Sequence, residues 1–165
     1  MRTSAKQIAL GGILAALAVV IMSLGGLIPV ATYTIPMLCA ILQYTVLRFC
    51  GSRIAWAWYG TVSILSLLLG PDKEAAAVFV FLGYYPILKP RMDQMKLPWL
   101  WKALLFNASV LAMYGLLIHL MGMGQIAAEF AELGKWMTVI MLILGNVIFF
   151  LLDKILDKYG KKGRR

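Results

Sequence analysis

The sequence predicts an all-α integral membrane protein, a compact bundle of six transmembrane helices with both termini in the cytoplasm. Three observations lead to this fold class. Hydrophobic residues make up 62% of the 165 residues and charged residues only 14%, whereas a soluble domain carries about a quarter charged residues. The apolar residues form runs long enough for membrane helices. The basic residues between these runs gather on one side of the predicted membrane.

The first two spans share one long segment, between Lys6 and Arg48, that contains no charged residue. Each membrane helix needs about 20 apolar residues, so this segment is long enough for two. Gly25-Gly26 and Pro29 mark the break, because glycine bends freely and proline lacks a backbone donor. The apolar run is longer than that of a signal peptide, so we expect the first span to be retained. The first two predicted spans are residues 7–28 and 31–48.

Charged clusters separate the remaining runs. The third run ends at Asp72, and the fourth is short, with Pro86 predicting a kink or an end of the helix. Between the last two runs lies a segment long enough for a short amphipathic helix, with Ile126, Phe130 and Leu133 in one stripe. The remaining predicted spans are residues 54–71, 74–89, 101–123 and 135–153, followed by a basic cytoplasmic tail over residues 154–165.

The basic residues predict the orientation. If all six runs cross, every Lys and Arg except Lys73 and Lys135 lies on the side of the two termini. Positive charge stays in the cytoplasm, so this arrangement predicts a bacterial plasma-membrane protein with both ends inside. A re-entrant fourth segment would move the basic segment 89–102 to the outside, which is why we expect it to cross. We attribute the net charge of +9 to this orientation and expect no nucleic-acid partner.

A charged turn on the outer side is the first candidate for binding a solute. Asp72, Lys73 and Glu74 lie between two apolar runs, where they could cover the mouth of a cavity and bind a polar solute. The alternative is a solvated loop with salt bridges among its own charges. Thr32 and Tyr33, at the outer start of the second span, are candidates for lining the same cavity.

Two polar residues within the last spans are further candidates. His119 lies in the outer third of the fifth span, and Asn146 in the middle of the sixth. Polar side chains at such depths face the bundle interior or a water-filled cavity. Solute contact and ordinary interhelical hydrogen bonding both stay open for His119, and Asn146 is a candidate for the cavity floor.

We expect no metal site and no cofactor. His119 is the only histidine, and Cys39 and Cys50 lack Cys-x-x-Cys spacing. There is no Gly-x-x-x-x-Gly-Lys loop, so ATP would be used only by a partner ATPase. The sequence also lacks a His-Glu-x-x-His motif and shows no Ser/His/Asp set, so we do not expect an enzyme.

The first span carries small residues at helical spacing, which are Ala5, Ala9, Gly12 and Ala16. Small residues on one face of a membrane helix let a second helix approach closely. Two interpretations stay open at this point. The face packs within the bundle, or it docks another membrane protein.

With these features the chain resembles the substrate-binding S components of bacterial energy-coupling factor (ECF) transporters. The likeness rests on six short helices, on Ala5-x-x-x-Ala9 and on the small-residue run from Ala9 to Ala16. The segment Gly70-Pro-Asp-Lys-Glu74 followed by Gly83-Tyr-Tyr-Pro-Ile-Leu-Lys89 is also similar to uncharacterised Firmicute membrane proteins of this type.

The resemblance implies capture of a vitamin or similar micronutrient from outside. It also implies a membrane scaffold subunit, which contacts the first helix at its Ala-x-x-x-Ala motif, and two ATPase subunits as partners. It leaves the substrate open. One alternative function is a structural or assembly protein of the cell envelope that binds no solute. A third is a small autonomous transporter or channel, although few charges lie within the spans for ion coupling.

Overall fold

The computed structural model describes residues 5–25, 31–119 and 124–162, and within these ranges it contains seven helices and no strand. Among the described residues, three helices are long and apolar enough to cross a membrane, judged by length and composition. These three are Ala5–Gly25, Thr32–Cys50 and Pro98–Ile118. The chain divides into two compact units, an N-terminal unit over residues 1–95 and a C-terminal unit over residues 96–165.

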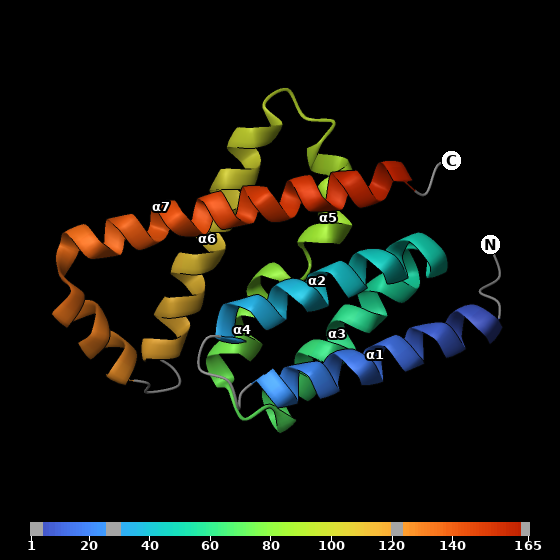
Figure 1. Cartoon of the computed structure of the whole chain (residues 1–165), viewed down its shortest axis with the longest axis horizontal. Helices are drawn as coiled ribbons and strands as arrows, with labels where there is room; N and C mark the ends of the chain where they lie inside the picture. The colour runs from blue at the N-terminus through green and yellow to red at the C-terminus, as the bar shows by residue number, and fades with distance from the viewer. Residues whose placement is uncertain (1–4, 26–30, 120–123, 163–165) are drawn as a thin grey trace. The chain divides into compact units, whose positions relative to one another are not determined.

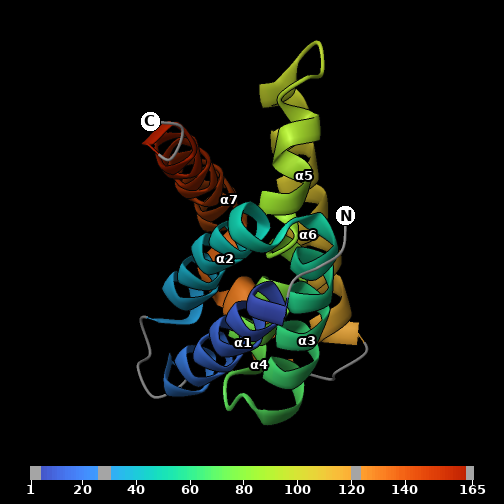
Figure 2. The same cartoon turned by 90° about the vertical axis from the view of Figure 1, so that its right-hand side faces the viewer.

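Five helices form the N-terminal unit, coloured from blue to green in Figure 1. The first three pack against one another, and Figure 2 shows them side by side. Successive helices run in opposite directions. The Gln7 side chain near the start of α1 donates to the Phe49 carbonyl near the end of α2, and the Thr32 hydroxyl near the start of α2 donates to Asp72, just after α3. The five helices are α1 (Ala5–Gly25), α2 (Ala31–Cys50), α3 (Ser52–Leu69), α4 (Lys73–Leu82) and α5 (Tyr85–Met92).

Two glycines let α1 approach its neighbours closely. A Cβ at Gly11 would lie 3.0 Å from Cγ2 of Ile54 on α3, and a Cβ at Gly25 would lie 2.4 Å from Cδ1 of Ile35 on α2. Both glycines are buried. These contacts therefore fix which face of α1 points inward. The same face contributes residues to the hydrophobic core of the unit. That core includes Ala18, Met22, Cys39, Val46, Trp58, Val62 and Phe79.

The fourth predicted span differs most from the structure. Where the sequence suggested one span over residues 74–89, the structure has the separate helices α4 and α5, joined by a turn at Gly83 and Tyr84. Pro86 lies in the first turn of α5, where its missing N–H costs no helical hydrogen bond. It therefore begins a helix, and Gly83 closes the preceding one by donating to the Phe79 carbonyl.

α4 is short, and its middle is buried on all sides. Five consecutive residues, Ala75 to Phe79, are buried, and consecutive positions point in all directions around a helix. A helix that is apolar all round belongs in a protein interior. Its ten residues span about 15 Å, which is about half the thickness of the hydrocarbon core.

The alternating helices place only basic side chains at one end of the described N-terminal unit and the mixed charges of Asp72, Lys73 and Glu74 at the other. The start of α1, the end of α2 and the start of α3 lie at one end, on the right of Figure 1. This end carries Lys6, Arg48 and Arg53. The start of α2 and the α3–α4 turn, with Asp72, lie at the other end.

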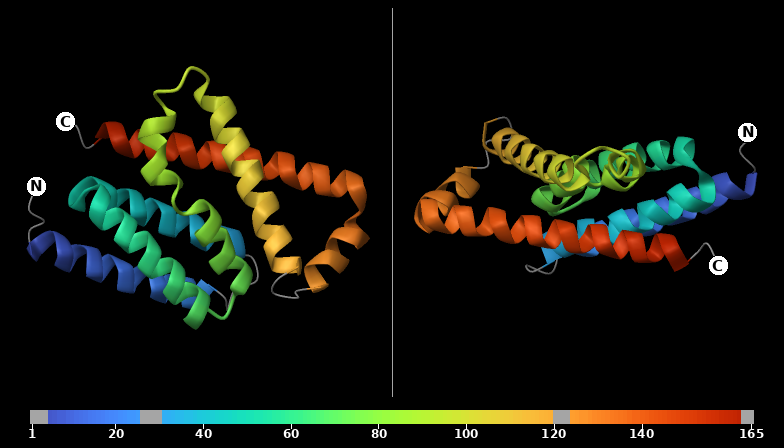
Figure 3. Two further views of the ribbon diagram at one scale, coloured as in Figure 1. Left: turned by 180° about the vertical axis from the view of Figure 1, so that it is seen from behind. Right: turned by 90° about the horizontal axis from the view of Figure 1, so that it is seen from above.

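The C-terminal unit consists of α6 (Pro98–His119) and α7 (Gly124–Lys162). Gly134 interrupts α7 with a positive φ of 71°, so this element is two helical pieces, visible as a bend in Figure 1. Seen from behind in Figure 3, α6 crosses the longer piece of α7. That piece covers the predicted sixth span and continues to Lys162, within the predicted basic tail over residues 154–165. The segment predicted as a short amphipathic helix is helical along its backbone, and its side chains lie outside the described part.

Candidate functional site

The structure brings together the predicted polar residues of α2 and the α3–α4 turn. The Thr32 hydroxyl donates to Oδ2 of Asp72 at 2.8 Å, and the Tyr33 hydroxyl donates to Oε1 of Glu74 at 2.7 Å. We call Thr32, Tyr33, Asp72, Lys73 and Glu74 the polar clasp. Its residues are half-buried except Tyr33, which is exposed. The clasp ties the start of α2 to the α3–α4 turn.

The charged side chains of the clasp also hold helix ends. Oδ1 of Asp72 accepts the backbone N–H of Ala75 at 2.9 Å, which caps the start of α4. Nζ of Lys73 donates to the carbonyls of Leu67 at 2.7 Å and Gly70 at 2.9 Å, where α3 ends. A cation at these carbonyls also complements the negative end of the helix dipole. The clasp therefore has a structural role that accounts for its main hydrogen bonds.

Asn146 pairs with Asn107 across α6 and α7. Each amide donates to the side-chain oxygen of the other, at 3.2 and 3.1 Å. Each also donates to a carbonyl one turn earlier in its own helix, that of Ala103 or Leu142, at 2.8 Å. The sequence predicted Asn146 as a candidate for a cavity floor, and the structure pairs it with Asn107 of α6. His119 is the last residue of α6, and its side chain lies outside the described part.

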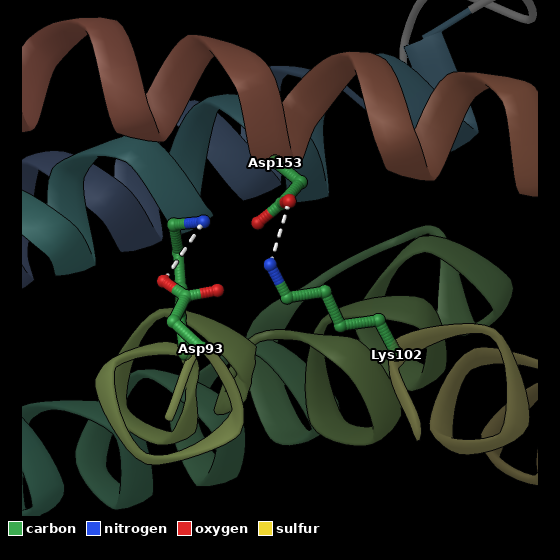
Figure 4. Close-up of polar contacts among 4 residues, drawn as sticks. Asp93, Lys102 and Asp153 are labelled. Atoms are coloured by element: carbon green, nitrogen blue, oxygen red, sulfur yellow. Dashed lines mark hydrogen bonds and ion pairs between the residues drawn. The ribbon is translucent and has the colours of Figure 1, made fainter. Parts of the chain in front are cut away.

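Sequence analysis missed a buried ion pair in the C-terminal unit. Nζ of Lys102 on α6 lies 2.8 Å from Oδ2 of Asp153 on α7, and Figure 4 shows this contact as a dashed line. Only 7% and 11% of the two side chains are exposed. Phe106 follows Lys102 by about one helical turn, and Phe149 precedes Asp153 by about one turn. Their rings stack on each other with centroids 4.9 Å apart. The sequence feature that could have indicated this pair is that Lys102 and Asp153 each stand at the border of an apolar run, on two consecutive predicted spans.

The small residues of α1 face outward from the N-terminal unit. Ala5, Ala9, Gly12 and Ala16 are all exposed, and a Cβ built at Gly12 would meet nothing within 4 Å. Larger apolar side chains flank them, among them Ile13 and Leu17, which are 67% and 45% exposed. The described residues leave this face of α1 uncovered.

A set of buried polar side chains was also missed as a possible site. Gln43, Trp58 and Ser66 were not among the predicted site residues. All three are buried in the N-terminal unit. The sequence signal was the presence of polar atoms on the inward faces of two helices that contain no charge in their central turns.

Comparisons with protein-family models, curated proteins and solved structures give no match for this chain.

Proposed function

We propose that this chain is the substrate-binding subunit of an ECF-type importer in a bacterial plasma membrane. It captures a small micronutrient from outside and depends on a membrane scaffold and ATPase subunits for release inside. Six membrane crossings with both termini in the cytoplasm are part of this proposal. The observation that carries it is the exposed small-residue face of α1, formed by Ala5, Ala9, Gly12 and Ala16.

This face supports docking over packing within the chain. α1 uses its other side to pack, through Gly11, Ala18, Met22 and Gly25, which are buried. The exposed side offers a nearly flat strip, because alanine and glycine let backbones approach closely. In lipid, close backbone packing is a main source of helix association. A partner helix is therefore a better explanation for the strip than contacts inside the chain.

The charge distribution supports the orientation. The end of the N-terminal unit with Lys6, Arg48 and Arg53 is assigned to the cytoplasm by the positive-inside rule. The polar clasp then faces the outside, where a solute arrives. α2 and α3 have lengths of 20 and 18 residues, which suits a crossing of the hydrocarbon core.

An assembly protein of the cell envelope is the second candidate function. It is favoured by the hydrogen bonds of Asp72 and Lys73, which are directed at helix ends. A scaffold needs a rigid exterior and no solute. Deletion of the gene would then alter cell shape and leave micronutrient uptake unchanged.

Co-purification tests the proposal. After gentle solubilisation of the native membrane, the chain is expected to carry a membrane scaffold and ATPases with it. Ala9→Leu and Gly12→Leu should reduce their recovery by roughly tenfold, which corresponds to about 1.4 kcal/mol of lost interface energy. Ala57→Leu is the matched control, because Ala57 is an exposed alanine on α3. Repeated isolation of the lone chain, or equal losses in the control, would contradict the proposal.

A further inference from the structure

The adjoining ends of α1, α2 and α3 carry basic side chains and no acidic one. Lys6 at the start of α1, Arg48 at the end of α2 and Arg53 at the start of α3 are all exposed. These three helix ends lie together on the right of Figure 1. The first acidic residue of the sequence is Asp72, which follows α3 at its opposite end. We call Lys6, Arg48 and Arg53 the basic end.

The positive charge of the basic end is not neutralised by the nearest acidic turn. The 18 residues of α3 separate Arg53 from Asp72 by about 27 Å, which is several times the Debye length of about 8 Å at physiological salt. Neither Lys6 nor Arg53 forms an ion pair within the described part of the chain. An anionic partner would therefore complement this end.

Arg53 also stands at the head of an exposed apolar face of α3. The residues within about 60° of Arg53 around the helix axis include Trp56, Gly60, Ile64 and Leu68. The side chains of Trp56, Ile64 and Leu68 are 44%, 60% and 72% exposed. A Cβ built at Gly60 would meet nothing within 4 Å. We call these four residues the α3 face, and Gly60 gives it open space about one turn from Trp56 and from Ile64.

The basic end and the α3 face together match the shape of a phospholipid. Ile64 lies about 16 Å beyond Arg53 along α3, and one leaflet contributes about 15 Å of the hydrocarbon core. The guanidinium fork of Arg53 suits the oxygens of a phosphate, and the amphipathic ring of Trp56 suits the boundary between headgroups and chains. A free phosphate or an acidic protein surface would use the cations and leave the apolar face unused.

We propose that the basic end and the α3 face bind an anionic phospholipid, with its phosphate at Arg53 and an acyl chain over Gly60, between Trp56 and Ile64. A zwitterionic lipid carries a cationic group that the other two cations of the basic end repel, so a headgroup with net negative charge is preferred. In the proposed orientation this lipid belongs to the cytoplasmic leaflet. That location rests on the proposed function, whereas the site itself needs only the N-terminal unit.

Native mass spectrometry of the full chain, released from micelles of an uncharged detergent, tests the proposal by measuring the dissociation constants of bound lipids. The probes are phosphatidylglycerol, which is anionic, and phosphatidylcholine with the same acyl chains, which is zwitterionic. We expect phosphatidylglycerol to bind at least about fivefold more tightly, the effect of one cation near an anionic headgroup. A large excess of inorganic phosphate should not displace it, because inorganic phosphate has no chain to contact the α3 face.

Two variants separate the headgroup from the chain. Arg53→Gln should weaken binding of phosphatidylglycerol by about fivefold, and Arg53→Lys should retain most of it. Arg91→Gln is the matched control, because Arg91 is an exposed arginine on α5. Gly60→Leu fills the open space on the α3 face and should weaken binding of both lipids alike. Gly115→Leu is its control, because a Cβ at Gly115 on α6 also meets nothing within 4 Å.

Equal binding of the two lipids, or equal losses in Arg53→Gln and Arg91→Gln, would overturn the proposal. A loss in Arg53→Gln with none in Gly60→Leu would do the same, because the cations would then serve a soluble anion or an acidic protein surface. The outcome is independent of assembly. Absence of co-purifying ATPases would contradict the proposed function and leave this site intact, whereas absence of a preference for phosphatidylglycerol would refute the site and leave the docking face of α1 untouched.

Discussion

Removing one partner of the Lys102–Asp153 ion pair should destabilise the C-terminal unit strongly. The two charged atoms lie 2.8 Å apart and the side chains are 7% and 11% exposed. At this distance, an effective dielectric constant of about 20 gives roughly 6 kcal/mol of attraction before desolvation is subtracted. Truncating one partner removes this contact from the other charge, which stays buried. We expect Lys102→Met or Asp153→Leu to lower the free energy of unfolding by about 3–5 kcal/mol.

The double variant should recover most of this loss. With both charges replaced by apolar side chains, neither member of the pair is left as a desolvated charge, and such replacements are often neutral or stabilising. Unfolding of the purified chain in mixed micelles, titrated with a denaturing detergent and followed by circular dichroism, measures all four proteins of the cycle. Single variants within about 0.5 kcal/mol of the original chain, as expected for solvent-exposed pairs, would refute the reasoning.

Three further predictions concern local packing and can use the same unfolding measurement. Asp72→Ala should cost about 1 kcal/mol because α4 loses its N-cap, whereas Asp72→Asn should cost less because the amide oxygen still accepts; equal losses would argue against capping. Gly25→Ala should destabilise by about 1–3 kcal/mol, since its Cβ would lie 2.4 Å from Ile35, and Gly12→Ala should be neutral or slightly stabilising because it meets nothing within 4 Å; the opposite order would contradict the packing of α1. Gly134→Ala should destabilise by about 1 kcal/mol because φ is 71° there, and an unchanged stability would mean that the bend relaxes.

The long helices followed well from the sequence. The predicted spans 7–28, 31–48, 54–71 and 101–123 agree within a few residues with α1, α2, α3 and α6. Hydrophobicity and charge suffice there, because a helix that faces lipid must be apolar over a fixed length. The crossing of the membrane and its direction stay predictions.

The short and bent elements followed less well. Pro86 was read as a break, yet its effect depends on where the new helix begins. The longer piece of α7 continues beyond the apolar run, because the buried residues Leu152, Asp153 and Leu156 give it a packed face among its charges. Local composition does not contain that information.

The candidate site was predicted as a set of residues but without its contacts. The sequence grouped Thr32 and Tyr33 with Asp72 and Glu74, and the structure joins them by hydrogen bonds. It did not predict that Asp72 caps α4, because capping depends on the backbone geometry of the turn. The pairing of Asn107 with Asn146 joins positions 39 residues apart, and such pairs follow only from the packing of two helices.

The burial of α4 has a consequence for the response of this chain to different membranes. In the proposed membrane orientation, a helix with exposed apolar side chains, such as α3 with Ile64 and Leu68, would match the local bilayer thickness by tilting or by deforming the lipid. α4 is buried from Ala75 to Phe79, so this middle part of the helix is exempt from that requirement. In thinner or thicker bilayers α1, α2 and α3 are expected to tilt, while α4 keeps its length and moves with the helices that enclose it.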